Sequence, residues 1–190
     1  MKTIVIDDFF KDYDRMLELA YKQKYYKREE HPEQREREAK WPGFRTDWLR
    51  KTDEGLYWSI VYQIQDHFDI QNNIPTQFAN VLRNRDYQIN AYYHYKTEAT
   101  EKDDGIHVDS GSYSIIVYMG PTNLQSGTVI VDLYDNPITD VKFVSNRAIM
   151  FDSQYRHKGY GAFGDSLQNG RLTLNAMLEF IDPQGAIWKN

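Results

Sequence analysis

The segment GIHVDSGS, residues 105–112, places a histidine and an aspartate two positions apart, where a polar loop leads into an apolar run. Side chains of an extended chain alternate between its two sides, so His107 and Asp109 face one side while Val108 faces the other. An imidazole nitrogen and a carboxylate oxygen can then reach a common point. Taken alone, the pair fits a metal site, a proton-transfer pair or the polar end of a strand.

A second histidine can join this pair from a later part of the chain. His157 lies in FDSQYRHKGYG, directly after the apolar segment RAIMF and before a glycine-rich loop. In an antiparallel barrel, a residue that leaves one strand can face a residue that enters a distant strand. His107, Asp109 and His157 are therefore expected to converge at one mouth. Two imidazoles and one carboxylate on one face of a metal leave coordination positions open, an arrangement that suits Fe(II).

An arginine begins the last strand-like segment. Arg171 opens RLTLNAMLEF, 14 residues after His157. A charged group at the end of an otherwise apolar strand needs an anion, and a guanidinium pairs bidentately with a carboxylate, as binding the far end of a dicarboxylic acid requires. Thr173 shares the face of Arg171 and can add a hydroxyl donor. The alternative is an ordinary salt bridge at a strand end.

The elements that must position these residues change character near residue 86. Before it, TIVIDDFF predicts a short strand that leads into a helix with Asp7 or Asp8 as N-cap. DEGLYWSIVYQIQDHF predicts a second helix. The buried faces of the two helices are expected to carry Phe10, Tyr13, Leu17, Ala20 and Tyr21 in the first, and Leu56, Ile60, Ile64 and Phe68 in the second.

After residue 86 the apolar residues recur with a period of two. The strand-like segments are DYQINAYYHY, SYSIIVYMG, GTVIVDLYD, VKFVS, RAIMFD and RLTLNAMLEFI. Six strands separated by turn signals within about 100 residues predict an antiparallel sandwich or barrel, with the helices packed outside it.

Composition limits the class of protein. The chain has 190 residues, 41% of them hydrophobic, and no linker-like break, which predicts one domain over residues 1–190. The absence of cysteine excludes disulfides, thiolate metal sites and a cysteine nucleophile. A net charge of -5 argues against nucleic acid as a partner. No apolar run or leader suggests a membrane, so we expect a cytoplasmic protein.

Three stretches together resemble the 2-oxoglutarate- and iron(II)-dependent oxygenases: GIHVDSGSYSIIVYMG, RAIMFDSQYRHKGYGAFG and GRLTLNAMLEF. The resemblance covers roughly residues 86–181. It implies a mainly β fold with a double-stranded β-helix core (jelly-roll, cupin-like), and residues 1–85 as a helical support region packed on its outside. It also implies that His107, Asp109 and His157 are catalytic residues and ligands of Fe(II).

The same resemblance implies a binding site for the cosubstrate. Arg171, helped by Thr173, would bind the C5 carboxylate of 2-oxoglutarate. The segment INAYY resembles a strand that contacts this cosubstrate in some members, which adds Asn90 and Tyr92 as candidates. Their alternative role is that of simple core residues.

The implied activity is that of a dioxygenase. It would use O2 and 2-oxoglutarate to hydroxylate an unactivated C–H bond of an amino-acid, peptide or small-metabolite substrate, releasing succinate and CO2, with ascorbate as an accessory reductant. Asp109 argues against related halogenases, in which a small residue leaves room for chloride. The chain is most similar to small phage and bacterial prolyl-hydroxylase-like members, although peptidyl-prolyl hydroxylases commonly have a lysine in place of Arg171. Met177 stands where nucleic-acid repair members carry a second arginine.

Two other functions fit the same residues. One is a non-catalytic jelly-roll module whose metal site senses or stores a small ligand. The other is a cupin-like enzyme that does not use 2-oxoglutarate, although such a site usually needs more histidines and leaves Arg171 without a task.

The segment WPGFRT and two further histidines complete the candidates. Pro42-Gly43 predicts a turn, and Trp41–Arg45 would form either a substrate lid over the mouth or a simple packed turn. His31, in a charge run, is expected to be exposed to solvent. His94, between two tyrosines, is expected to be exposed as well, with contact to the substrate as the alternative.

Overall fold

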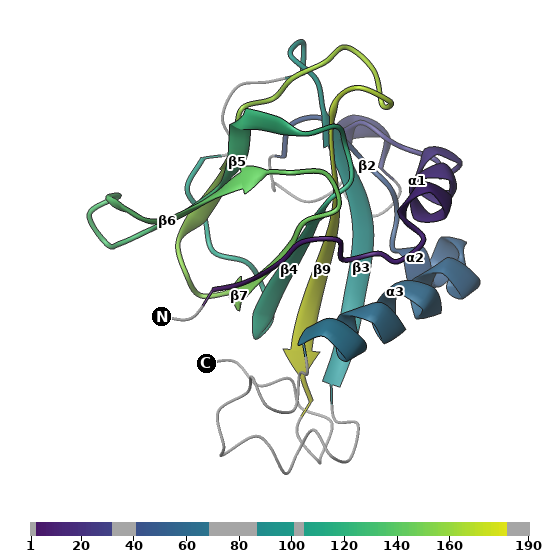
Figure 1. Ribbon diagram of the computed structural model, residues 1–190, viewed down its shortest axis with the longest axis horizontal. Helices are drawn as coiled ribbons and strands as arrows, with labels where there is room; N and C mark the ends of the chain where they lie inside the picture. Colours follow the sequence, from purple (N-terminus) through teal and green to yellow (C-terminus); the bar gives the residue numbers. More distant parts are fainter. Residues whose placement is uncertain (1–2, 32–40, 69–86, 101–104, 182–190) are drawn as a thin grey trace.

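The computed structural model describes residues 3–31, 41–68, 87–100 and 105–181, and within them two antiparallel sheets (Figure 1). The larger sheet has, in spatial order, β1 (Ile4–Ile6), β7 (Ala148–Asp152), β4 (Tyr113–Tyr118), β9 (Arg171–Phe180), β3 (Tyr87–Lys96) and β2 (Phe44–Arg45). The smaller sheet has β6 (Pro137–Phe143), β5 (Asn123–Val131) and β8 (His157–Tyr160). The strand-like segments after residue 86 thus form strands, and the predicted mainly β, jelly-roll fold is confirmed.

Three α-helices lie before β3 in the described residues: α1 (Tyr13–Tyr21), α2 (Leu49–Thr52) and α3 (Glu54–Phe68), with a short 3-10 helix at Arg28–Glu30. Figure 1 shows α1 and α3 on the outer side of the larger sheet, away from β5 and β6. No helix in this part of the chain is long and apolar enough to span a membrane.

The first helix starts later than the sequence predicted. Its N-cap is Asp12, whose side chain accepts a hydrogen bond from the Arg15 amide, and neither Asp7 nor Asp8 caps it. Asp8 has a φ of 51°, in the left-handed region, so the chain turns there before a helix can begin. Phe10 therefore precedes the helix, yet it is buried.

Two hydrophobic cores hold the layers together. The first lies between the helices and the larger sheet, where Ile60 and Ile64 of α3 belong to the same buried cluster as Leu174 of β9. The second includes residues of both sheets, among them Tyr118 and Phe143, whose rings stack 4.4 Å apart. Alternation along the strands of the larger sheet lets one face pack on the helices while the other faces the smaller sheet.

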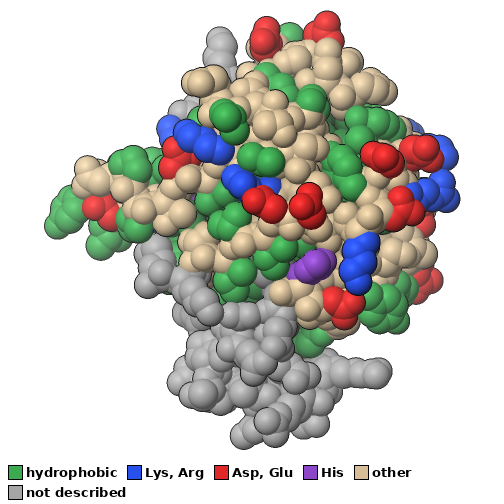
Figure 2. Space-filling view, in the orientation of Figure 1, with side chains coloured by type: hydrophobic (Ala, Val, Ile, Leu, Met, Phe, Trp, Pro, Cys, Tyr) green, Lys and Arg blue, Asp and Glu red, His purple; other side chains and the backbone are tan. Residues whose placement is uncertain are grey.

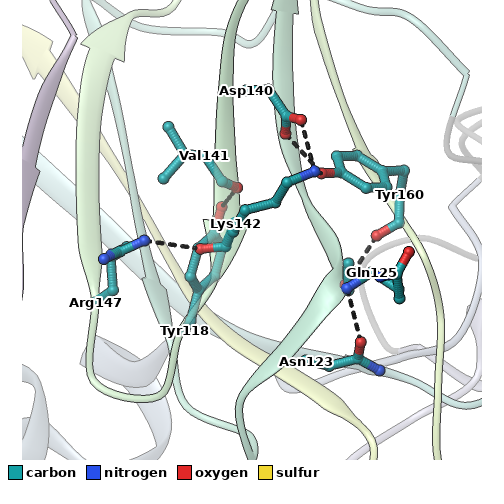
Figure 3. Close-up of polar contacts among 9 residues, drawn as sticks. Tyr118, Asn123, Gln125, Asp140, Val141, Lys142, Arg147 and Tyr160 are labelled. Carbon is teal, nitrogen blue, oxygen red and sulfur yellow. Dashed lines mark hydrogen bonds and ion pairs between the residues drawn. The ribbon is translucent and has the colours of Figure 1, made fainter.

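Polar side chains tie the smaller sheet together across its middle strand (Figure 3). Lys142 of β6 donates to Asp140 (2.7 Å) and to the hydroxyl of Tyr160 in β8 (2.8 Å), and that hydroxyl donates to Asp140 (2.6 Å). Gly127 of β5 lies between Lys142 and Tyr160 in the register. Because Gly127 has no side chain, the Tyr160 ring can cross above it.

The hairpin between β5 and β6 projects from the molecule and carries hydrophobic side chains at its tip (Figure 2). Leu133 and Tyr134 there are 83% and 84% exposed. Neither residue lines the cavity described below.

Two short strands were not predicted. The glycine-rich stretch that follows His157 was predicted to be a loop, but His157–Tyr160 forms β8; Phe44–Arg45 was predicted to be part of a turn but forms β2. The segment that contains His107 was expected to enter a strand, and it instead makes a single isolated bridge to His157.

Candidate metal centre

The backbone brings the three candidate ligands together from two distant parts of the chain. The His107 amide donates to the His157 carbonyl (3.0 Å), and the His157 amide donates to the His107 carbonyl (2.9 Å). The Asp109 amide donates to the Ser153 carbonyl (3.0 Å). These bonds hold the loop before β4 against the start of β8, so the juxtaposition is fixed by main-chain pairing.

The side chains of this triad meet at one point. Nε2 of His157 lies 3.3 Å from Oδ2 of Asp109, and Nε2 of His107 lies 3.6 Å from Oδ1. One ligand atom from each residue lies within 4.8 Å of the other two. A single ion can therefore contact all three.

Hydrogen bonds on the far side of each ring set the imidazole tautomers. Nδ1 of His107 lies 3.0 Å from the Gly105 carbonyl, and Nδ1 of His157 lies 2.8 Å from the Tyr155 carbonyl. A carbonyl only accepts, so each Nδ1 carries a proton and each Nε2 is directed toward the shared point. This is the orientation in which histidine binds metal.

Asp109 is held as a carboxylate. Ser114 donates to its Oδ2 (2.6 Å) and also lies 2.9 Å from the hydroxyl of Ser153. Burial alone would raise the pKa of Asp109, but hydrogen bonding and charge from His157, with smaller contributions from Ser114 and His107, lower the pKa below its ordinary value of 3.8. Two imidazoles and one carboxylate form a donor set that fits Fe(II).

The triad opens into a cavity of about 330 Å³. Among the predicted cosubstrate residues, Arg171, Thr173 and Tyr92 line it with the triad, and Asn90 does not. Asn90 nevertheless shares a face of β3 with Tyr92, as its spacing predicted.

Arg171 is a buried cation facing this cavity. Its side chain is hydrogen-bonded through Nε to Ser126 (3.2 Å) and through Nη2 to the Gly127 carbonyl (3.0 Å), and the residue is 4% exposed. No carboxylate in the described parts of the chain forms an ion pair with it. A buried guanidinium without a counter-ion fits an anionic ligand, because leaving such a charge unpaired is costly. The strand-end salt bridge that was the alternative is absent among these residues.

The Thr173 hydroxyl makes hydrogen bonds within the protein. Its hydroxyl donates to the His94 carbonyl (3.2 Å) across the β3–β9 pair, and its oxygen accepts from Asn175 (3.0 Å). The donor assigned to the cosubstrate is thus engaged with the backbone in this structure.

Two histidines expected at the surface are buried. His94 is 6% exposed, lines the cavity and contacts the Pro42 carbonyl through Nε2. His31 is 5% exposed, with Nε2 3.2 Å from the Thr46 carbonyl. The Trp41 ring packs against the rings of His31 and His94, with centroids 6.0 and 6.2 Å apart. The local sequence around each histidine does not indicate this contact, so their burial could not be predicted.

Part of the WPGFRT segment lines the cavity and part packs on β3. Trp41 and Arg45 line the cavity, whereas Phe44 stacks on Tyr95 with ring centroids 4.6 Å apart. Sequence reasoning missed Ser114 and Ser126, which position Asp109 and Arg171, because a serine in a strand carries no signal of its partner.

Comparison with known proteins identifies the fold. No family model and no curated protein matches the sequence. A 2OG-Fe(II) oxygenase-family oxidoreductase from Burkholderia pseudomallei is similar in structure, with a TM-score of 0.60 at 12% identity over 93% of this chain and 84% of that one. A prolyl-4-hydroxylase from Pseudomonas putida is also similar, with a TM-score of 0.55 at 13% identity over 93% of this chain and 91% of that one.

HygX from Streptomyces hygroscopicus is a third similar structure, solved with iron bound. It gives a TM-score of 0.57 at 10% identity, over 93% of this chain and 81% of HygX. A further HygX structure holds nickel and 2-oxoglutarate. The chain therefore has the fold of 2OG-Fe(II) oxygenases.

Proposed function

We propose that this protein is an Fe(II)- and 2-oxoglutarate-dependent dioxygenase that hydroxylates an unactivated C–H bond of an amino-acid, peptide or small-metabolite substrate. One observation carries the proposal: the converging His107, Asp109 and His157 side chains open into the cavity that contains the buried Arg171, for which the described residues offer no counter-ion. The shared fold supports this choice of reaction class.

Each residue has a defined task in this proposal. His107, Asp109 and His157 would hold the iron and leave positions for 2-oxoglutarate and O2. Iron would supply the activation of O2 by oxidative decarboxylation of 2-oxoglutarate to succinate and CO2. Arg171 would fix the C5 carboxylate of 2-oxoglutarate, and its burial would keep water from competing for that pair.

The rest of the chain supports the site. We propose that residues 1–190 act as one domain, in which the helices before residue 86 cover the outer face of the larger sheet. The absence of cysteine fits a reducing cytoplasm as its location.

The test asks whether the protein that binds Fe(II) and 2-oxoglutarate also converts 2-oxoglutarate to succinate. The anaerobic protein with Fe(II) and 2-oxoglutarate should develop a visible charge-transfer absorption band, and exposure to air should then release succinate. His157→Ala should give neither signal. A band without succinate would identify a module that only binds its ligands, and the absence of both in the wild type would refute the oxygenase proposal.

A further inference from the structure

A second cavity, of about 180 Å³, adjoins the metal cavity. Its lining consists of His31, Arg45, Thr46, Trp48, Tyr92, Ser110 and Met177. The two cavities share Arg45, Tyr92, Ser110 and Met177 in their walls. A molecule in this side cavity would therefore lie next to the space in front of the triad.

Arg45 stands between the two cavities, held by aromatic rings. Its guanidinium carbon lies 4.7 Å from the centroid of the Trp41 ring and 5.0 Å from that of Tyr92. Cation–π contacts of this kind orient a guanidinium without using its N–H donors. The hydrogen-bonding edge of Arg45 is thus left for another group.

That edge lacks a partner among the described residues. Nε of Arg45 is buried and has no hydrogen bond there, and no carboxylate in these parts of the chain forms an ion pair with Arg45. A buried donor without an acceptor costs about 1–3 kcal/mol. An oxygen of a bound ligand would remove that cost.

The backbone places Arg45 rigidly. Arg45 exchanges two hydrogen bonds with Tyr26, of 3.0 and 2.8 Å, and pairs with His94 of β3. The preceding turn depends on Gly43, which has a φ of +82°, and a Cβ there would collide with the Tyr95 carbonyl. Because its backbone is paired on both sides and its guanidinium lies against two rings, Arg45 is preorganised for binding.

We infer that Arg45 binds a carboxylate of the substrate, which makes the substrate a carboxylic acid of amino-acid size or the C-terminus of a peptide. This inference rests on the proposed function. The described lining of the side cavity contains no acidic residue, and Arg45 supplies its one guanidinium or ammonium group. A single positive charge balances a monoanion. Trp48, Tyr92 and Met177 provide apolar surface for the rest of the substrate.

The test compares acids with matched amides. Protein loaded with Mn(II), a redox-stable substitute for Fe(II), and 2-oxoglutarate is titrated calorimetrically with N-acetyl amino acids, with their amides, and with short peptides bearing a free or amidated C-terminus. At least one acid should bind tenfold or more tightly than its amide. Tighter binding of an N-acetyl amino acid would identify a small carboxylic acid as the substrate, and tighter binding of a peptide with a free C-terminus would identify a peptide.

Substitutions of Arg45 test whether this residue causes the preference for acids over amides. Arg45→Gln should lose the discrimination between acid and amide, and Arg45→Lys, which keeps the charge but not the fork, should retain part of it. Arg50→Gln, on the exposed side of α2, is the control and should behave as the wild type. Near-ultraviolet circular dichroism of each variant reports whether it is folded.

The inference would be overturned if no acid in the panel bound more tightly than its amide, or if Arg45→Gln kept the preference. A tenfold weaker affinity of Arg45→Gln for 2-oxoglutarate would also overturn it, because Arg45 would then serve the cosubstrate. The anaerobic absorption band of the wild type is independent of these titrations, so a failed substrate assignment can be told from a failed oxygenase assignment.

Discussion

The two arginines of the cavities are held in different ways, and this difference gives them different tasks. Arg171 lies 5.5 Å from the Phe143 ring centroid and is fixed mainly by hydrogen bonds to Ser126 and Gly127, which use part of its fork, and no carboxylate of the described residues pairs with it. Arg45 lies between two ring faces, and its buried Nε has no hydrogen-bond partner among the described residues. We therefore expect Arg171 to be essential for the cosubstrate and Arg45 to select the substrate.

Arg171→Gln should separate binding of the cosubstrate from binding of the metal. The affinity for 2-oxoglutarate is expected to fall about 10- to 100-fold, since hydrogen bonds to charged groups contribute about 1.5–3 kcal/mol. The affinity for Mn(II) should not change, because the residue does not contact the triad. Calorimetric titration of each ligand measures both. Normal binding of 2-oxoglutarate by Arg171→Gln would show that another residue takes its C5 carboxylate.

Ser114 positions Asp109 but is not itself one of the three candidate metal ligands. Its hydroxyl donates to Oδ2 of Asp109 at 2.6 Å, so Ser114→Ala frees the carboxylate to rotate. Loss of such a supporting bond typically lowers metal affinity 10- to 100-fold, and we expect a decrease in this range (about 10-fold or more) for Mn(II). Electron paramagnetic resonance of free Mn(II) measures it. Ser59→Ala, at an exposed position of α3, is the matched control. Equal affinities in the two variants would contradict this role.

At the scale of elements, the strands with regular alternation could be predicted and the short ones could not. Strands β3, β4 and β9 carry apolar residues with a period of two, so their pattern is local. β8 is four residues long and contains Gly159, and its extended state comes from pairing with β5 and from the bridge to His107. Such pairing is a tertiary effect, which a local pattern does not contain.

The smaller sheet provides an element-scale prediction at Gly127. A Cβ there would lie 2.9 Å from the Tyr160 hydroxyl and would collide with the Val141 carbonyl. Gly127→Ala should therefore destabilise the protein by about 1–3 kcal/mol in urea unfolding. It should also weaken 2-oxoglutarate binding, because the Gly127 carbonyl accepts a hydrogen bond from Arg171.

Gly55→Ala is the matched control for this substitution. Gly55 lies in α3, where a Cβ would meet one atom, Oδ1 of Asp53, at 3.8 Å. Alanine should stabilise the helix there by up to about 1 kcal/mol. Equal unfolding free energies for Gly127→Ala and the wild type would mean that Tyr160 moves aside without cost.

At the scale of the whole molecule, the candidate site could be predicted in part. Convergence of His107, Asp109 and His157 followed from the expectation of a barrel, whose closure brings distant strand ends together. The place of Arg45 could not be predicted, because it depends on a two-residue strand and on the turn at Gly43. Buried His31 and His94 were missed for the same reason, since both rings contact Trp41, which directly precedes that turn.

The site joins the two sheets, which predicts that its ligands stabilise the whole fold. His157 belongs to the smaller sheet, and Arg171 reaches from the larger sheet to Ser126 and Gly127 of the smaller one. A ligand at 100 times its Kd adds about 2.7 kcal/mol to the folded state. For a chain of this size, that amounts to a rise in Tm of about 5–10 °C. Mn(II) should give one such rise, and 2-oxoglutarate should add a second.

The variants separate these two steps in thermal unfolding followed by circular dichroism. His157→Ala should lose the rise with Mn(II), and Arg171→Gln should keep it while losing the further rise with 2-oxoglutarate. This pattern distinguishes a ligand bound between the sheets from one bound at the surface, because surface binding would raise the Tm of all three proteins alike. An equal response of wild type and His157→Ala to Mn(II) would therefore place the metal elsewhere and remove the basis for the proposed reaction.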